Sequence, residues 1–130
     1  MGKTVIATPE APGAIGPYSQ AIAIPAGATL LFCSGQIALL PQTGQLLQGD
    51  VVAQTEQVMR NLAAVLKAGG CDFSHVVKTT IFLANLGDFA AVNEVYGRHF
   101  PSAPPARSTI QAAGLPRGAL VEIEVTAQRP

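Results

Sequence analysis

The chain has 130 residues, which is long enough for one domain with a core that needs neither disulfides nor metal. Eight Lys and Arg residues balance eight Asp and Glu residues, so the net charge is zero. This balance argues against a nucleic-acid-binding protein, because such proteins normally show a basic patch or a high isoelectric point. No run approaches the ~20 apolar residues that span a bilayer, and the N-terminus does not resemble a signal peptide. We therefore expect a soluble, cytoplasmic protein.

Charged residues are scarce. They make up 12% of the chain, against about 25% in typical globular domains. A chain with so few charges cannot cover its whole surface with them, and exposed apolar patches usually mark interfaces. We therefore expect part of the surface to be buried against other copies of the same chain.

The N-terminal part is predicted to form short strands separated by turns. Residues 4–8 read as a first strand, followed by a loop rich in Pro and Gly that ends at Tyr18. The Tyr18 ring either caps the sheet or presents its hydroxyl to a pocket. Residues 19–24 and 29–34 are predicted to pair as a hairpin, because a short turn containing Gly joins them.

The end of the strand 29–34 is a candidate binding position. Ser34, Gly35 and Gln36 follow one another here, and a glycine can let a ligand approach the backbone closely. A plain bulge or strand end is the alternative reading.

Two helices and a buried strand are predicted in the middle of the chain. Residues 50–67 have one apolar stripe, with Asp50 as the N-cap and two glycines as the stop. Residues 76–83 are β-branched and apolar, which predicts a buried strand. The second helix, 87–99, is predicted to place Phe89, Val92 and Tyr96 on its core face, with Asn93 nearby. Asn93 either bonds a neighbouring strand or points towards a site.

The last quarter, residues 105–127, is predicted to be a hairpin around a turn of Gly and Pro residues. Alternation places Arg107 and Thr109 on one face of the first strand, and Glu122 and Glu124 on one face of the second. These groups are either solvated charges on a half-exposed strand or a site for a small acid. In a site, the Arg fork would bind a carboxylate and a Glu would accept a proton from water. Whether Arg107 and Glu122 converge within one subunit is left open by the sequence.

The cysteines and histidines are scattered singly, without the spacing of a zinc site or a redox pair: Cys33, Cys71, His75 and His99. We therefore predict no metal and no cofactor. Cys33 is read as a small core residue. The order of the elements predicts an α+β fold, with both helices on one face of a mixed sheet.

Several motifs together resemble one known family. They are P-A-R-S-x-I-x-x-A-x-L followed after five residues by V-E-I-E, together with A-I-G-P-Y-S-Q-A, S-G-Q-I, V-K-T-T-I-F-L and D-F-A-A-V-N upstream. Their order and spacing resemble the reactive intermediate deaminase A family, also called the YjgF family, over nearly the whole chain. The resemblance implies a single domain of this type over residues 1–130. It also implies a chorismate mutase-like fold and trimers whose sheets form a central barrel, with active sites in the clefts between subunits.

The same resemblance implies an activity. Members hydrolyse 2-aminoacrylate and related enamines or imines to 2-keto acids and ammonia, as 2-iminobutanoate/2-iminopropanoate deaminases. Carried over, Arg107 would bind the substrate carboxylate, Glu122 would activate water, and Tyr18 would complete the pocket. The backbone N–H groups of Gly35 and Thr109 would hold polar substrate atoms. Ser34, Phe89 and Asn93 are further candidates for the pocket lining.

One departure from the family pattern is Thr109, which stands where several members have Cys. It casts doubt on thiol-based regulation rather than on deamination. Two other functions remain as alternatives: a non-catalytic module that binds small carboxylates, and a ribonuclease or translation inhibitor. The neutral charge and the lack of a basic, aromatic-bearing stripe argue against the ribonuclease.

Overall fold

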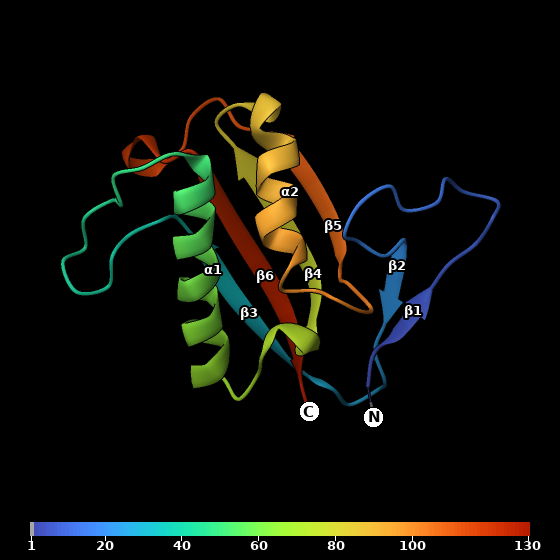
Figure 1. Ribbon diagram of the computed structural model, residues 1–130. Coiled ribbons are helices and arrows are strands. Elements are labelled where there is room, and N and C mark those ends of the chain that lie inside the picture. Colours follow the sequence, from blue (N-terminus) through green and yellow to red (C-terminus); the bar gives the residue numbers. More distant parts are fainter. Residues whose placement is uncertain (1) are drawn as a thin grey trace.

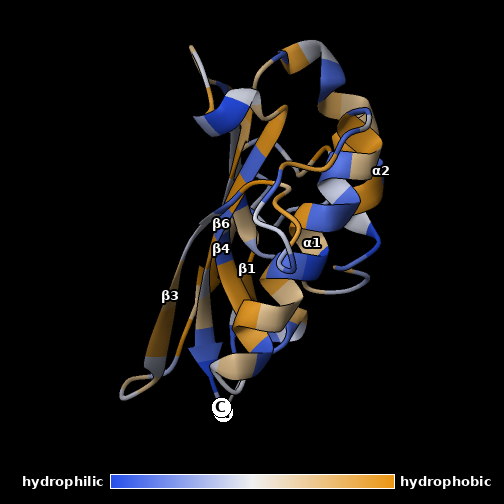
Figure 2. Ribbon diagram, turned by 90° about the vertical axis from the view of Figure 1, so that its left-hand side faces the viewer, coloured by the Kyte–Doolittle hydropathy of each residue, from blue (hydrophilic) through white to orange (hydrophobic). Residues whose placement is uncertain are grey.

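Two helices lie across one face of a four-stranded sheet, and the opposite face of that sheet carries no helix within the described residues (Figures 1 and 2). The computed structural model describes residues 2–130. The main elements are β1 (Thr4–Ile6), β2 (Ala21–Ala23), β3 (Thr29–Gln36), α1 (Val51–Ala68), β4 (Val76–Leu83), α2 (Phe89–Gly97), β5 (Ala106–Gln111) and β6 (Val121–Arg129). Short 3-10 turns occur at Phe73–His75, Leu86–Asp88 and Pro116–Gly118. The α+β class with both helices on one face of a mixed sheet is thus confirmed.

The strand pairing differs from the two predicted hairpins. The large sheet has the order β3-β6-β4-β5, in which only β4 and β5 are parallel, and β1 pairs with β2 in a separate two-stranded sheet. Strands β5 and β6 are therefore not neighbours, because α2 carries the chain from β4 to a parallel β5 and β6 then pairs with the other edge of β4. Strand β2 likewise pairs with β1 rather than with β3, so both hairpin predictions were wrong.

The two helices begin and end near the predicted residues. At the start of α1, the Asp50 side chain accepts a hydrogen bond from the Ala53 backbone N–H at 2.9 Å, which satisfies one of the free donors of the first turn. Gly69 is the C-cap of this helix. Helix α2 is shorter than the predicted range 87–99, because the turn Leu86–Asp88 precedes it as a 3-10 segment.

The core lies between the helices and the sheet. Alternate residues of the two central strands face the helices and are fully buried, including Ile81 and Leu83 of β4 and Ile123 of β6. The apolar stripe of α1 covers them, and its fully buried members are Val58, Leu62 and Leu66, whereas Val65, which the predicted stripe also included, is 37% exposed. Each such side chain contributes about 1.5–3 kcal/mol relative to an exposed one.

The other face of the sheet remains open in the single chain. Several large apolar side chains are exposed there, among them Phe32 at 75%, Ile110 at 48% and Leu30 at 39%. We call this surface the open face; β3, β5 and β6 contribute to it, and it also carries Glu122 and Glu124. No helix within residues 2–130 combines the length and the hydropathy that crossing a membrane requires.

Candidate active site

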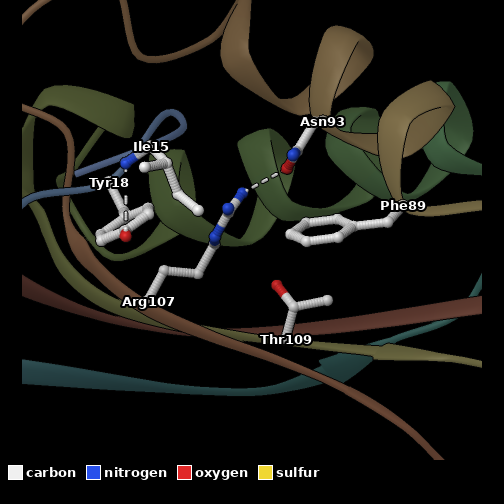
Figure 3. A pocket seen from close by; sticks show the side chains of 6 residues that line it. All are labelled: Ile15, Tyr18, Phe89, Asn93, Arg107 and Thr109. Carbon is white, nitrogen blue, oxygen red and sulfur yellow. Dashed lines mark hydrogen bonds between the residues drawn. The ribbon is translucent and has the colours of Figure 1, made fainter. Parts of the chain in front are cut away.

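A cavity of about 290 Å³ opens between the loop before β2, the start of α2 and strand β5 (Figure 3). Its wall is formed by Ile15, Tyr18, Phe89, Asn93, Arg107 and Thr109. The loop supplies Ile15 and Tyr18, α2 supplies Phe89 and Asn93, and β5 supplies the other two. Segments that are far apart in the sequence therefore meet around one small space.

Arg107 reaches this cavity because of the alternation along β5. It is paired in register with Thr79 of β4, which faces the helices, so Arg107 projects from the same face of the sheet. Its Nη1 donates a hydrogen bond to Oδ1 of Asn93 at 2.6 Å. The prediction that Asn93 either bonds a strand or faces a site is resolved as both, because its partner on β5 lies in the cavity wall.

Aromatic rings surround the Arg107 guanidinium on several sides. Its central carbon lies 5.5 Å from the ring centroid of Tyr18, 5.5 Å from that of Phe89 and 5.2 Å from that of Tyr96. These distances fall within the range of cation–π attraction. Burial among these groups lowers the pKa of Arg107 from its ordinary value, yet a guanidinium remains charged at neutral pH.

No acidic group within residues 2–130 neutralises this charge. The ion pairs in that range are Asp72 with His75 and Glu94 with Arg98, and neither includes Arg107. The described part of the chain also places no Asp or Glu in the cavity wall. A half-buried cation whose hydrogen-bond partner is a neutral amide is well suited to receive an anionic ligand.

The loop before β2 approaches Arg107 closely. The Tyr18 hydroxyl accepts a hydrogen bond from the backbone N–H of Ile15 at 3.4 Å, which ties the loop to the ring. A Cβ placed on Gly16 would lie 3.4 Å from Arg107 Nη2, which is van der Waals contact, so the loop backbone passes directly beside the guanidinium. The Tyr18 ring thus lies in the cavity wall, while its hydroxyl is bonded to the loop at Ile15.

Thr109 lies two residues after Arg107 on the same face of β5. Its side chain projects into the space beside Arg107 and Phe89 (Figure 3). The hydroxyl oxygen is buried and has no hydrogen-bond partner within the described residues. An unsatisfied buried hydroxyl is costly, so its position at a cavity makes it a candidate contact for a ligand.

Glu122, Gly35 and Ser34 lie outside this cavity in the single chain. Glu122 is in register with Phe82 of β4, whose neighbours Ile81 and Leu83 face the helices, so Glu122 belongs to the open face. A Cβ on Gly35 would overlap the Glu122 carboxylate, so the carboxylate lies against that glycine. Ser34 is exposed. Arg107 and Glu122 of one chain thus project from opposite faces of the sheet.

Sequence reasoning missed two residues near Arg107. Ile15 is 93% exposed at the mouth of the cavity, and its only signal was its place in the motif A-I-G-P-Y. Tyr96 was assigned to the core face of α2, where it is indeed fully buried. Its contact with Arg107 could not be predicted from the sequence. Helix periodicity shows which side chains face the sheet, but it does not show which strand residue each of them contacts.

Comparison with known proteins identifies the family. The family model described as Endoribonuclease L-PSP matches residues 8–129. Protein DfrA of Myxococcus xanthus is 61% identical over 127 residues, which cover 98% of this chain and 96% of that protein. The 2-iminobutanoate/2-iminopropanoate deaminase of Mus musculus is 50% identical over 125 residues, which cover 96% and 90%.

A solved structure gives the same result. The crystal structure of E. coli TdcF with bound serine has a TM-score of 0.73 and 39% sequence identity, over 98% of this chain and 99% of that one. The family model and these relatives show that the chain belongs to the Endoribonuclease L-PSP family. This is the reactive intermediate deaminase A family that its motifs resemble.

Proposed function

We propose that this protein is an enamine/imine deaminase, which hydrolyses 2-imino acids such as 2-iminobutanoate and 2-iminopropanoate to 2-keto acids and ammonia. Relatives about half identical to this chain bear that activity in their names. The observation that carries the proposal is Arg107, a half-buried cation in a cavity wall without an acidic partner within residues 2–130.

The guanidinium is suited to the carboxylate that all these substrates share. Arginine has five N–H donors, and the hydrogen bond to Asn93 fixes Nη1 and leaves other donors for a ligand. A planar fork can bind a carboxylate through two parallel hydrogen bonds. The rings of Tyr18 and Phe89 exclude water from the pair, which strengthens the attraction between the opposite charges.

The reaction needs an attacking water and a place for the electrons of the C=N bond. The water oxygen bonds to the imine carbon and gives up one proton, the π electrons move to nitrogen, and nitrogen takes up a proton, which gives a carbinolamine. A proton then passes from the new hydroxyl to the amino nitrogen, the C–N bond breaks with its electrons on nitrogen, and ammonia departs to leave the 2-keto acid. A carboxylate near the water can accept its proton and pass a proton on to the nitrogen.

Glu122 is our candidate for that carboxylate, and it requires a second copy of the chain. Because Arg107 and Glu122 project from opposite faces of one sheet, Glu122 of one copy would meet Arg107 of another. We propose a chorismate mutase-like trimer in which the open faces pack into a central barrel and the active sites lie in the clefts between copies. The exposed Phe32 and Ile110 support burial of this face. Backbone N–H groups of Gly35 and Thr109 would hold polar substrate atoms.

An assay with in situ substrate tests the activity. A dehydratase generates 2-iminobutanoate, and release of the keto acid is followed with and without the protein. We expect acceleration by the native protein and a loss of at least tenfold in Arg107→Lys, because a point charge replaces the planar fork. Arg98→Lys is the matched control, since Arg98 is exposed and pairs with Glu94 on the surface. Equal rates for native protein and Arg107→Lys would refute the role of the arginine.

A module that only binds small carboxylates is the second candidate. It is favoured by one observation, which is that no carboxylate lies in the cavity wall of the described chain. Glu122→Gln separates the two functions. In a deaminase, the variant should keep binding 2-ketobutyrate while its turnover falls. In a binding module, Glu122 has no role, so the substitution should change neither quantity. Unchanged turnover in Glu122→Gln would remove Glu122 from the mechanism.

A further inference from the structure

Close to the Arg107 guanidinium lies a fully buried ring that does not line the cavity. Tyr96 of α2 is fully buried and does not belong to the cavity wall, yet its ring centroid is 5.2 Å from the central carbon of the guanidinium. Tyr18 and Phe89, at 5.5 Å each, line the cavity and can contact a ligand directly. Tyr96 is therefore placed to influence a bound ligand through Arg107 and not by direct contact.

A hydrogen bond fixes the Tyr96 ring to the sheet. Its hydroxyl lies 2.8 Å from Oγ1 of Thr79, and both residues are buried. Thr79 is the β4 residue in direct register with Arg107 of β5. The bond thus joins the last part of α2 to the β4 residue that lies beside Arg107 in the sheet.

We propose that Tyr96 and Thr79 form a positioning pair, which sets the Arg107 guanidinium where the carboxylate of a 2-imino acid binds. The inference rests on the deaminase function proposed above and extends it to two buried residues that never meet the substrate. Asn93 binds one nitrogen of the guanidinium, and the Tyr96 ring lies within cation–π distance of its central carbon. Two contacts of different kinds leave the planar fork fewer orientations than either would alone.

The chemistry of tyrosine suits this support. Burial raises the pKa of Tyr96 to about 12, so the hydroxyl stays neutral at physiological pH. The ring attracts the guanidinium by its π-electrons without cancelling its charge. A carboxylate in the same place would form an internal ion pair and compete with the substrate. The arginine is therefore held firmly while its charge remains free for a ligand.

The competing explanation is that Tyr96 is only a core residue. Its ring packs 4.7 Å from that of Phe100, which in turn contacts Phe73. Phe100 offers a matched control, because it is 6% exposed, belongs to the same cluster, and has no contact with Arg107 among the described ring contacts. A change there disturbs the core without touching the proposed support.

The test measures carboxylate binding and turnover separately. Titration with 2-ketobutyrate gives the Kd, and the in situ imine assay gives turnover, for Tyr96→Phe, Thr79→Val, Thr79→Ser and Phe100→Leu. We expect the Kd to rise about five- to twentyfold in Tyr96→Phe and in Thr79→Val, with turnover at saturation within about threefold of native. Thr79→Ser keeps the hydroxyl and should restore a native Kd. Phe100→Leu should lower the melting temperature and leave the Kd unchanged.

A double-mutant cycle with Arg107 decides whether the pair acts through the arginine. In an Arg107→Lys background, Tyr96→Phe should change the Kd less than twofold. The proposal is overturned if Tyr96→Phe lowers the melting temperature like Phe100→Leu but leaves the Kd native, or if its effect persists undiminished without the arginine. The deaminase function survives both of those results. Imine hydrolysis that is insensitive to Arg107→Lys would instead overturn the site assignment, and the positioning pair with it.

Discussion

At the scale of single residues, two groups in the cavity wall lack a partner of their own kind within residues 2–130: a cation without an anion, and a hydroxyl without a hydrogen bond. The Arg107 charge has no acidic neighbour and the Thr109 hydroxyl has no hydrogen-bond partner within residues 2–130. The first attracts an anion, and the second is a neutral hydrogen-bonding group two residues along the same strand. A 2-imino acid carries the matching pair, a carboxylate next to a polar C=N group. The polar groups of the cavity are thus consistent with the proposed substrate class.

Thr109→Val tests the hydroxyl with little change of shape. Because a buried hydroxyl without a partner costs about 1–3 kcal/mol, we expect the free energy of unfolding of Thr109→Val to equal or exceed the native value. We expect kcat/KM for the in situ imine to fall by roughly tenfold, since the ligand loses a hydrogen bond worth about 1 kcal/mol or more. Denaturant titration and the deaminase assay measure the two effects.

Thr109→Ser is the matched control for this residue, because it keeps the hydroxyl and removes only the methyl group. It should retain most of the native activity. If Thr109→Val proves less stable than native and equally active, the hydroxyl has a partner in solution and plays no part in substrate binding.

At the scale of elements, local signals were sufficient for the helices and for β4. Asp50, the apolar stripe and Gly69 placed α1 within one residue of its observed ends, and the strand prediction 76–83 matches β4. These signals act between residues that are near in sequence, so they can be read from it. Strand pairing is different, because β6 pairs with β3 and β4, which lie far away in the chain.

The same distinction applies to the site. Arg107, Tyr18, Phe89, Asn93 and Thr109 were all candidates for the site, and all five lie in the cavity wall. Phe89 was also expected on the core face of its helix, but it is 36% exposed. Their mutual geometry was not predictable, because it depends on α2 crossing over β4 and β5. The sequence pattern predicted that β5 and β6 pair as a hairpin, and because β4 lies between them, it could not show that Arg107 and Glu122 project from opposite faces of the sheet.

The capping of α1 gives a prediction about an element. Asp50→Ala removes the hydrogen bond to the Ala53 N–H, so we expect the free energy of unfolding to fall by about 1 kcal/mol. Asp88→Ala is the control, because Asp88 precedes α2 without a side-chain cap hydrogen bond. Denaturant unfolding should show a clear loss for Asp50→Ala and a change of only a few tenths of a kcal/mol for Asp88→Ala. Equal losses would mean that the hydrogen bond between Asp50 and Ala53 contributes no stability.

At the scale of the whole molecule, the open face connects composition with chemistry. A chain with 12% charged residues leaves Phe32, Leu30 and Ile110 exposed on the face that also carries Glu122. If copies associate through this face, the apolar contacts stabilise the assembly and the carboxylate is delivered to a neighbouring cavity. Association and catalysis would then depend on the same surface.

Phe32→Glu tests that dependence. Phe32 is 75% exposed in the single chain, opposite Thr126 of β6, and a charge there would have to be desolvated in a packed interface. We expect sedimentation to show a smaller species than native, with a loss of deaminase activity of at least tenfold and a cooperative unfolding transition retained. Val65→Glu is the control, because Val65 is an exposed apolar residue on α1, away from the sheet face, and it should change neither size nor activity. A Phe32→Glu monomer with native activity would mean that the site is complete within one chain, and Glu122 of a second copy would have no role in it.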